Sequence, residues 1–296
     1  MGQAGVPFKS AAMDQTVAII TPAWNAQATI VTTVASALAQ THAEWELWLI
    51  ADDGFDYERF LAQAGIADPR IRFLSSGGNG RGASNARNVA LERITAPYAA
   101  ILDADDRLKP RKLEKAVAAL AEHGIVSTAL DVMTEDFAHL RHVGDGPDRV
   151  LSAGTHKWVS LSMDSMIVWD RRRADGRYDP TMSNMTDLEF LLQLYRTAPT
   201  SMHLGTPLHD YIKRSSSMSN GKNVATGMIA SKTEILRRLE TGHYGLPAEE
   251  AEGCAAFLRI SLQAEARYEA ALAAHPGLLF EDHLQPMLAA AGRGLP

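Results

Sequence analysis

Four short apolar runs in the N-terminal third of the chain, separated by segments with helical spacing, restrict the folds open to this sequence. They cover residues 16–20, 45–51, 71–74 and 98–102. Each run is long enough for a buried strand but short for a buried helix. After the first run, Ile30, Val34 and Leu38 recur at helical spacing, with Asn25 placed to cap that helix. Since alternating strands and helices require crossover connections, we predict an α/β fold with a largely parallel sheet.

This rhythm breaks after about residue 124. There we expect a turn at 144–147, short mixed strands within 153–169, a helix over 185–196, a strand at 207–212 and a polar loop at 215–223. From Val224 onward the chain is rich in Ala, Leu, Glu and Arg, with interruptions at 245–247 and 276–277. This pattern predicts two or three helices in a tail separate from the α/β body.

Composition excludes several classes of function. The 29 Lys and Arg against 35 Asp and Glu give a net charge of −6, so we expect no binding to a nucleic-acid backbone. The single cysteine, Cys254, can form neither an internal disulfide nor a cysteine-based zinc site. No apolar run reaches the ~18–20 residues of a membrane span, and residues 1–15 lack the apolar stretch of a signal peptide. We therefore expect a soluble, cytoplasmic protein.

Polar residues stand at the carboxyl ends of three predicted strands: Thr21, Asp52–Asp53 and the cluster that begins at Asp103. In an open parallel sheet, ligands bind at this edge, so these residues should converge on one crevice. Asp103 and Asp105 leave their strand on the same side, and a hard divalent cation such as Mg²⁺ would relieve their repulsion. The alternative interpretation is a solvated acidic turn, or Asp106 as the cap of the following helix.

A glycine-rich segment, residues 77–83, precedes a predicted helix. From Gly78 it matches G-x-G-x-x-A, the fingerprint of dinucleotide-binding folds, and Asp103 lies 20 residues beyond Ala83. We discount this match because the fingerprint opens the first strand–helix unit, whereas two such units precede it here. Instead, the glycines would let the backbone approach a substrate, with Arg87 reaching a phosphate; a surface ion pair is the alternative for Arg87.

Five sequence blocks carry a family resemblance. They are TVAIITPAWN (16–25), SALAQT (36–41), WELWLIADDG (45–54), RGASNARN (81–88) and ILDADD (101–106). In this order and spacing they resemble the family 2 glycosyltransferases, inverting enzymes of the GT-A fold, which has a Rossmann-like, mostly parallel central sheet. The resemblance is close over residues 16–120 and looser to about residue 220.

The resemblance implies a domain division. Residues 1–15 would be an N-terminal extension, residues 16–222 the GT-A domain and residues 223–296 a helical C-terminal region. Within the GT-A domain, residues 16–122 would bind the nucleotide and residues 123–222 the acceptor.

The resemblance also implies a nucleotide-diphosphate-sugar donor, usually a UDP-sugar, and roles for particular residues. Thr21 and Asp53 match positions that contact the uracil, Arg87 matches a basic donor-binding position, and Asp103 and Asp105 match the D-x-D that holds Mg²⁺ or Mn²⁺ and the donor, with Asp105 as the more direct metal ligand. Asp187, in a later acidic motif, matches the general base. A base on the face opposite the leaving diphosphate would invert the anomeric carbon in one displacement.

Two further positions depart from the family pattern. Glu189 would be the companion acid of Asp187, but Thr186 stands where an acidic residue is common. The segment 211–219 is similar to the family's closing loop, with Arg214 where a histidine is common. Arg214 would then contact the diphosphate of the donor; the alternative is a basic residue on a solvated loop.

The acceptor implied is a glycan, a lipid-linked sugar or a small molecule, used in bacterial surface glycan synthesis at or near the inner face of the membrane. The alternatives are a non-catalytic nucleotide-binding relative and a nucleotide-sugar pyrophosphorylase, although the latter needs a glycine- and Arg/Lys-rich loop after the first strand.

Three other features are given ordinary interpretations. His139 and His142 could share a helix face but have no evident third metal ligand, and we interpret them as surface histidines. Residues 171–173, three arginines, are interpreted as a solvated turn, with contact to acidic headgroups as the alternative. The apolar stripe near Phe257 and Leu258 indicates core packing or a self-association face that would allow a homodimer.

Overall fold

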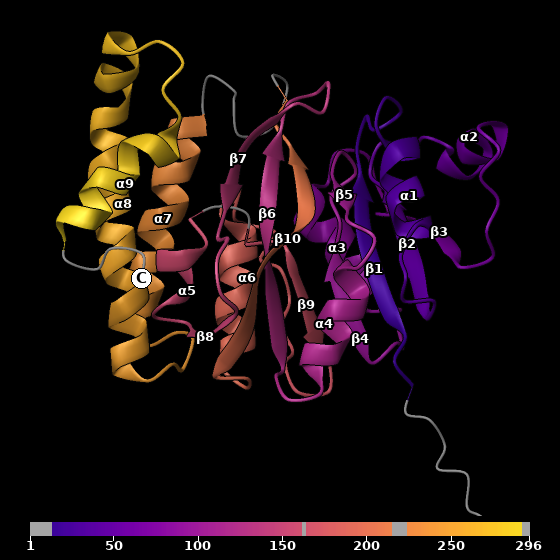
Figure 1. The fold of residues 1–296 in the computed structure, drawn as a ribbon, viewed down its shortest axis with the longest axis horizontal. Coiled ribbons are helices and arrows are strands. Elements are labelled where there is room, and N and C mark those ends of the chain that lie inside the picture. The colour runs from indigo at the N-terminus through magenta and orange to yellow at the C-terminus, as the bar shows by residue number, and fades with distance from the viewer. Residues whose placement is uncertain (1–13, 162–163, 215–223, 292–296) are drawn as a thin grey trace, which may run out of the picture.

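A mixed β-sheet runs through the molecule, with helices packed on both of its faces (Figure 1). The structure is a computed structural model, and it describes residues 14–161, 164–214 and 224–291. The indigo and violet N-terminal elements lie at one end of the sheet, and the orange and yellow C-terminal helices lie at the other (Figure 1).

The N-terminal half repeats strand and helix, as predicted. Its elements are β1 (Val17–Ala23), α1 (Ile30–Leu38), β2 (Trp45–Ala51), α2 (Tyr57–Gln63), β3 (Ile71–Ser75), α3 (Ala83–Leu91), β4 (Tyr98–Ile101), β5 (Arg107–Leu108) and α4 (Lys112–Leu120). β1 pairs in parallel with both β2 and β4, and β2 pairs in parallel with β3. The parallel sheet predicted for this half is therefore confirmed.

The second half is less regular. Its elements are β6 (Ile125–Met133), β7 (His139–Val143), β8 (Arg149–Ser152), α5 (His156–Val159), β9 (Ile167–Asp170), α6 (Thr186–Tyr195) and β10 (Thr200–Ile212). The predicted helix at 185–196 is present, while the mixed strands expected within 153–169 are a short helix followed by β9. The strand expected at 207–212 begins earlier, at Thr200. Its first residues were missed because a glycine and a proline within the strand interrupt its apolar pattern.

The strand order is β3-β2-β1-β4-β9-β6-β10-β5, with β7 beside β6 and β8 beside β10. β9 runs antiparallel to both of its neighbours, β4 and β6, whereas β6 and β10 are parallel. The sheet is thus parallel in its first four strands and mixed beyond them.

Alternation along the strands builds two apolar layers. In β1, Val17 and Ile19 belong to a cluster with α1 and α4, whereas Ala18 and Ile20 belong to a cluster with α3 and α6. Successive side chains of a strand point to opposite faces, so the uninterrupted apolar run is what a sheet covered on both faces requires.

Two local interpretations are corrected by the structure. Asn25 does not cap α1: its φ is 50°, its backbone N–H donates to Asp53, and the helix follows Thr29. The arginine run forms the predicted turn, and Arg172 and Arg173 are exposed, but Arg171 is not freely solvated. Arg171 donates to the carbonyl oxygens of Ile94 and Ala96, at 2.9 Å each, so it fastens β9 to the loop before β4.

The C-terminal region consists of α7 (Val224–Glu240), α8 (Ala248–Ala274) and α9 (Phe280–Ala290), as its composition predicted. It is not separate from the body, however. The apolar cluster that contains Ile20 of β1 and Phe190 of α6 also contains Leu258 of α8 and Leu288 of α9. Phe257 and Leu258 are buried in this core, so the apolar stripe packs inside the molecule. Within the described ranges, no helix is both long and apolar enough to cross a membrane.

The docking of α8 depends on two glycines. A Cβ built on Gly253 would lie 2.7 Å from Cα of Gly154, in the turn before α5. In the same contact, Glu250 accepts the N–H of Gly154 at 2.7 Å, and the indole N–H of Trp158 donates to the carbonyl of Gly253 at 3.0 Å. The backbones therefore approach more closely than any larger residue would permit.

We predict that Gly253→Ala lowers the free energy of unfolding by about 1–3 kcal/mol, because the added methyl group meets backbone that cannot move aside. The sign of the change in the free energy of unfolding distinguishes this packing from an open helix position. Gly→Ala inside an unobstructed helix stabilises by about 1 kcal/mol, so a variant more stable than the wild type in urea denaturation would contradict this packing.

Candidate active site

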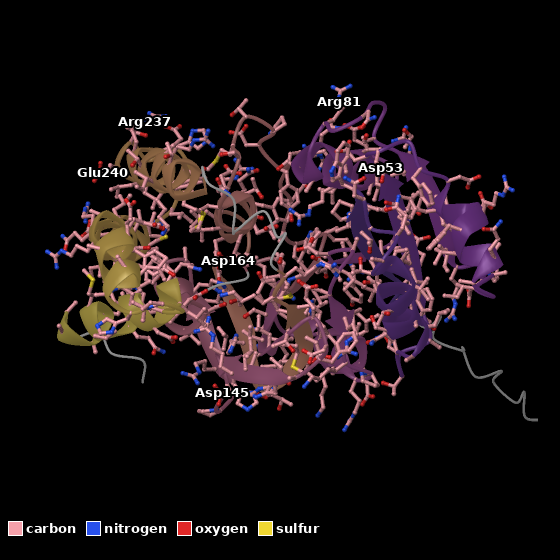
Figure 2. The ribbon with its side chains drawn as sticks, turned by 90° about the horizontal axis from the view of Figure 1, so that it is seen from above. Asp53, Arg81, Asp145, Asp164, Arg237 and Glu240 are labelled. Atoms are coloured by element: carbon pink, nitrogen blue, oxygen red, sulfur yellow. The ribbon has the colours of Figure 1, made fainter. Side chains whose placement is uncertain are left out.

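The site lies where the carboxyl ends of the parallel strands meet the N-terminus of α3. Asp52 and Asp53 follow β2, and Asp103 follows β4, as the sequence predicted. Seen from above, Asp53 and Arg81 lie on the N-terminal half, away from Arg237 on the C-terminal helices (Figure 2).

A buried arginine joins the predicted metal site to the predicted base. Nη2 of Arg87 lies 2.7 Å from Oδ1 of Asp103, and Nη1 lies 3.0 Å from Oδ1 of Asp187. The guanidinium is only 4% exposed, whereas the two carboxylates are 27% and 25% exposed. It also lies over the ring of Tyr178, 4.9 Å from the centroid. Two acidic residues far apart in the sequence are therefore held next to each other by one cation.

The electrostatics of Asp187 suit proton transfer. Burial raises its pKa to about 6, with the Asp103 charge acting in the same direction and the Arg87 guanidinium opposing both. The hydroxyl of Tyr178 donates to Oδ1 of Asp187 at 3.2 Å. A carboxylate of this pKa is largely ionised at neutral pH and more basic than an exposed aspartate.

Asp103 and Asp105, the two acidic residues of the D-x-D, interact electrostatically. Burial, together with the neighbouring Asp103 charge, raises the pKa of Asp105 to about 6. Since each ionised carboxylate disfavours the other, a cation between them would be stabilising. Carboxylate oxygens are the ligands that Mg²⁺ and Mn²⁺ prefer.

The third aspartate of the cluster, Asp106, is structural. It is 1% exposed, accepts the N–H of Ile212 at 2.9 Å and lies 3.3 Å from Nε2 of His209. Nδ1 of His209 lies 2.8 Å from Nζ of Lys112. Burial lowers the pKa of His209 well below its ordinary value, so a neutral ring joins the lysine to the aspartate. Asp106 thus binds β10, and its interpretation as a helix cap is wrong.

Asp53 is held rigidly at the rim of the site. Its Oδ2 accepts the N–H of Asn25 and the hydroxyl of Tyr57, both at 2.8 Å, and its Oδ1 accepts the N–H of Phe55 at 3.0 Å. These hydrogen bonds outweigh burial and keep the Asp53 pKa below its ordinary value. The side chain of Thr21, in contrast, is fully buried, and its hydroxyl has no partner among the described residues.

The neighbouring Asp52 organises the glycine-rich loop. Its two carboxylate oxygens accept the N–H groups of Arg81, at 3.0 Å, and Gly82, at 2.8 Å, and its carbonyl accepts the N–H of Gly80 at 2.7 Å. In a dinucleotide-binding fold such N–H groups would face a pyrophosphate. Here a carboxylate already accepts them, which agrees with discounting the fingerprint.

Arg214 lies at the end of β10, where Nη2 is 3.8 Å from Oε2 of Glu135. Residues 215–219 of the predicted closing loop lie outside the described residues, so the role of this loop in closing the site stays a prediction.

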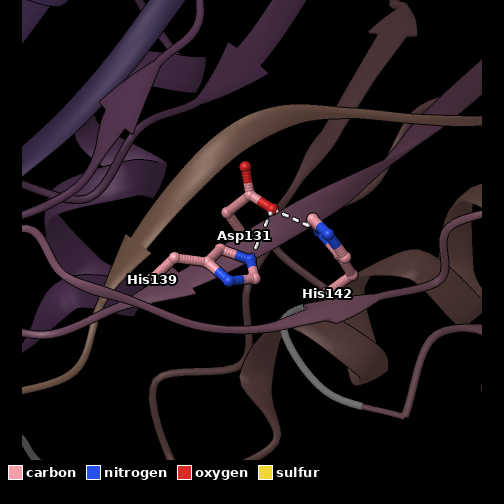
Figure 3. Close-up of side chains that lie close together, drawn as sticks. All are labelled: Asp131, His139 and His142. Atoms are coloured by element: carbon pink, nitrogen blue, oxygen red, sulfur yellow. Dashed lines mark hydrogen bonds and ion pairs between the residues drawn. The ribbon is translucent and has the colours of Figure 1, made fainter.

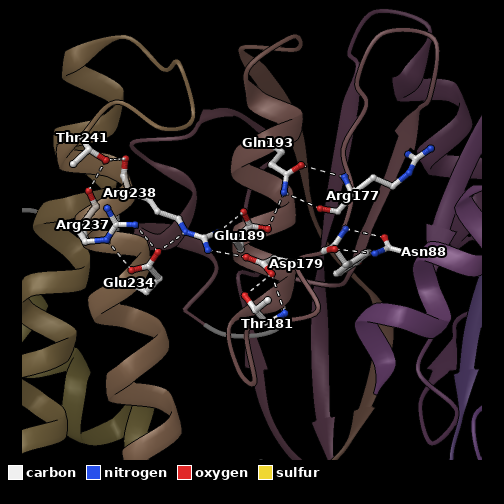
Figure 4. A network of polar contacts seen from close by, with 11 residues as sticks. Asn88, Arg177, Asp179, Thr181, Glu189, Gln193, Glu234, Arg237, Arg238 and Thr241 are labelled. Carbon is white, nitrogen blue, oxygen red and sulfur yellow. Dashed lines mark hydrogen bonds and ion pairs between the residues drawn. The ribbon is translucent and has the colours of Figure 1, made fainter. Parts of the chain in front are cut away.

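The companion acid, Glu189, belongs to a second network of polar contacts (Figure 4). It is 1% exposed and pairs at 3.1 Å with Nη1 of Arg238 on α7, whose Nη2 pairs at 2.7 Å with Asp179. Gln193 donates to Glu189 at 2.8 Å. The C-terminal region therefore holds the helix that carries Asp187.

Sequence reasoning missed three contributors to this geometry. The amide of Asn88 accepts from the N–H of Tyr178 and donates to its carbonyl, at 2.9 and 2.8 Å, and Tyr178 stacks on Phe190 at 4.3 Å. Asn88 is the last residue of the block 81–88, so its position beside Arg87 could have marked it as a site residue. Nothing local to the sequence marked Tyr178 or Arg238.

The fold is the GT-A fold of glycosyltransferases. The crystal structure of residues 1–349 of TarS from S. aureus in complex with UDP-GlcNAc superimposes with a TM-score of 0.65, over 95% of this chain and 82% of that one, at 16% identity. At this identity the likeness establishes the fold.

Sequence comparison establishes the family. The family described as Glycosyl transferase family 2 matches residues 18–159. TuaG of Bacillus subtilis (strain 168), named as a teichuronic acid biosynthesis glycosyltransferase, is 31% identical over 77% of this chain and 90% of its own length. WfgD of Escherichia coli, named as a UDP-Glc:α-D-GlcNAc-diphosphoundecaprenol β-1,3-glucosyltransferase, is 38% identical over 38% of this chain and 44% of its own. The chain belongs to the family 2 glycosyltransferases. The pyrophosphorylase alternative is thereby set aside.

We predict that Arg87→Gln lowers the free energy of unfolding by about 2–3 kcal/mol at about pH 8, because two partly buried carboxylates lose their shared cation. Without the Arg87 guanidinium the folded-state pKa of Asp187 rises above its value of about 6, so the loss should shrink as the pH falls toward about 6 and Asp187 takes up a proton. Urea denaturation at about pH 8 and about pH 5 measures the difference, with the exposed Arg81→Gln as control. A loss independent of pH would contradict this account.

Proposed function

We propose that this protein transfers a sugar from a UDP-sugar to a hydroxyl of an acceptor, with inversion at the anomeric carbon and with the help of a divalent metal ion. The observation that carries the proposal is the Arg87 bridge, which keeps Asp187 next to the Asp103 of the D-x-D pair. The named ligands of similar proteins support the donor class: TarS has been crystallised with UDP and with UDP-GlcNAc, and the name of WfgD specifies UDP-Glc.

In the proposed reaction, the Asp187 carboxylate accepts the proton of the acceptor hydroxyl. The hydroxyl oxygen forms a bond to the anomeric carbon as the bond from that carbon to the UDP oxygen breaks, and UDP leaves with the electron pair. A positioned base contributes ~10²–10⁴-fold to such a step. Mg²⁺ or Mn²⁺ held by Asp103 and Asp105 would offset negative charge on the leaving diphosphate.

The remaining site residues would bind and orient the donor. Asp53 would contact the uracil, and Arg214 would contact the diphosphate. The side chain of Thr21 is fully buried, so the contact with the uracil that the resemblance implied for it is not part of the proposal. Arg87 keeps its charge between Asp103 and Asp187, so its first role in this proposal is to position the two carboxylates and its second is to attract the donor. Tyr178 would orient the base through its hydrogen bond to Oδ1 of Asp187.

The acceptor would be a glycan or a lipid-linked sugar of bacterial surface polysaccharide synthesis, bound by the half formed by residues 123–222. The names of TuaG and WfgD point to this class of acceptor. A lipid-linked acceptor would bring the protein to the inner face of the cytoplasmic membrane.

A donor-hydrolysis screen tests the donor and the metal without knowledge of the acceptor. UDP-, GDP- and dTDP-sugars are incubated with the full chain and Mg²⁺, Mn²⁺ or chelator, and release of the nucleoside diphosphate is measured. We expect slow release from one or more UDP-sugars, and only with metal. Release from GDP- or dTDP-sugars alone would overturn the donor class, and release unaffected by chelator would overturn the metal.

Two substitutions should separate the metal site from the base. Asp105→Ala should weaken metal-dependent UDP binding and transfer together, because it removes a carboxylate next to the diphosphate. Asp187→Asn keeps size and hydrogen bonding but accepts no proton, so UDP affinity should stay within a few-fold while kcat falls ~10²-fold or more. Calorimetry with UDP and steady-state transfer assays give both quantities.

Asp175→Asn, at an aspartate whose side chain is 79% exposed, is the matched control and should change neither quantity. If Asp187→Asn retains near-normal transfer, Asp187 is not the base. If it abolishes UDP binding as Asp105→Ala does, its role is donor binding.

A further inference from the structure

Outside the crevice, two histidines and an aspartate converge on one face of the β6–β7 hairpin (Figure 3). His139 and His142 lie on β7 and Asp131 lies on β6. The sequence interpretation allowed the histidines a shared helix face and found no third ligand nearby. In the structure they lie on a strand, and Asp131 faces them. Their side chains are 42% and 49% exposed, as expected for surface histidines.

A shift in strand register brings the two histidines together. Residues three apart on a regular strand point to opposite faces. Here Asp131 pairs with His142, and the pairing then shifts so that Met133 lies opposite His139 rather than opposite Leu140. One extra residue in β7 therefore turns His139 to the face of His142 and Asp131, as β-bulges do when they re-aim a side chain.

The three side chains direct their donor atoms at one point. Nε2 of His139 lies 3.2 Å from Oδ1 of Asp131, and Nδ1 of His142 is still closer to the same oxygen, at 2.5 Å. One donor atom from each residue lies within 4.8 Å of the other two. The second oxygen, Oδ2, is paired with Lys109, so the carboxylate is held in place with Oδ1 turned to the histidines.

We propose that Asp131, His139 and His142 bind a divalent transition-metal ion such as Zn²⁺, at a site separate from the D-x-D pair. Two imidazole nitrogens with one carboxylate oxygen suit zinc and its neighbours, whereas Mg²⁺ prefers oxygen alone. Three protein ligands leave a position for water. This site shares no residue with the proposed donor site, so its test does not depend on the proposed function.

The charges around the three ligands determine how tightly the ion is expected to bind. Lys109 and Arg107 pair with Asp131 and Asp210, so the charges next to the ligands cancel and add no attraction for a cation. We therefore expect affinity in the micromolar range. The Lys109 ammonium repels a cation, so Lys109→Gln should tighten zinc binding. Hydrogen bonds between the histidines and Asp131, with no metal site, would not produce such an increase in zinc affinity.

An ion here would fasten β7 to the sheet. Among the described strands β7 pairs with β6 alone, and Arg141, also on β7, contacts Glu281 of α9 at 3.2 Å. A bound ion would hold β6 and β7 together by their side chains in addition to their backbone pairing, and its binding should raise the melting temperature.

The test is a ZnCl₂ titration of the metal-stripped full chain by calorimetry at about pH 7.5, because zinc binding requires deprotonated ligands and weakens as the pH falls. Asp105→Ala serves as the background, so that zinc held by the D-x-D pair does not contribute. We expect one zinc per chain. Adding His139→Ala and His142→Ala should weaken binding at least ~tenfold and abolish the zinc-dependent rise in melting temperature. His275→Ala, at an exposed histidine on the end of α8, should leave both unchanged.

Unaltered zinc affinity in the double histidine variant would overturn the proposal, as would the absence of micromolar binding in the Asp105→Ala background. Melting of each variant without metal shows that the fold is intact.

Discussion

A single buried cation, the guanidinium of Arg87, is the contact on which the arrangement of the site depends. An arginine that is 4% exposed needs anionic partners, and Arg87 finds them in Asp103, on the first half of the sheet, and Asp187, on α6. Both partners remain partly exposed, so their carboxylates stay accessible to a ligand. The ring of Tyr178 lies against the guanidinium, and its hydroxyl donates to Asp187. Removal of Arg87 would therefore disturb Tyr178 and Asp187 together.

The first half of the fold and part of the site could be predicted from the sequence. Apolar runs ended by polar residues located the four parallel strands, and parallel strands bring their carboxyl ends to one edge, so Asp53 and Asp103 had to lie there. The edge strands β7 and β8 escaped prediction because their outer residues face solvent and carry little apolar pattern; His139 and Val150 are both exposed.

The contacts that complete the site could not be read locally. Asp187 was placed by family resemblance, but its pairing with Arg87 joins elements from different halves of the chain. Arg238 reaches Glu189 from α7, across a boundary that the sequence interpretation treated as the end of the α/β body. Such long-range pairs depend on how layers pack, and spacing along the chain carries no signal of that.

The shared core of the C-terminal helices has a consequence for the order in which the molecule can assemble. The cluster under α3 and α6 draws its members from Ala18 through Leu288, whereas the cluster on the other face is complete by Leu208. As the chain leaves the ribosome, one face of the sheet can be covered early, while the other keeps apolar surface uncovered until the last helices have been synthesised. An emerging chain of this kind depends on chaperones, or on rapid translation of its last segment, to avoid association through that surface.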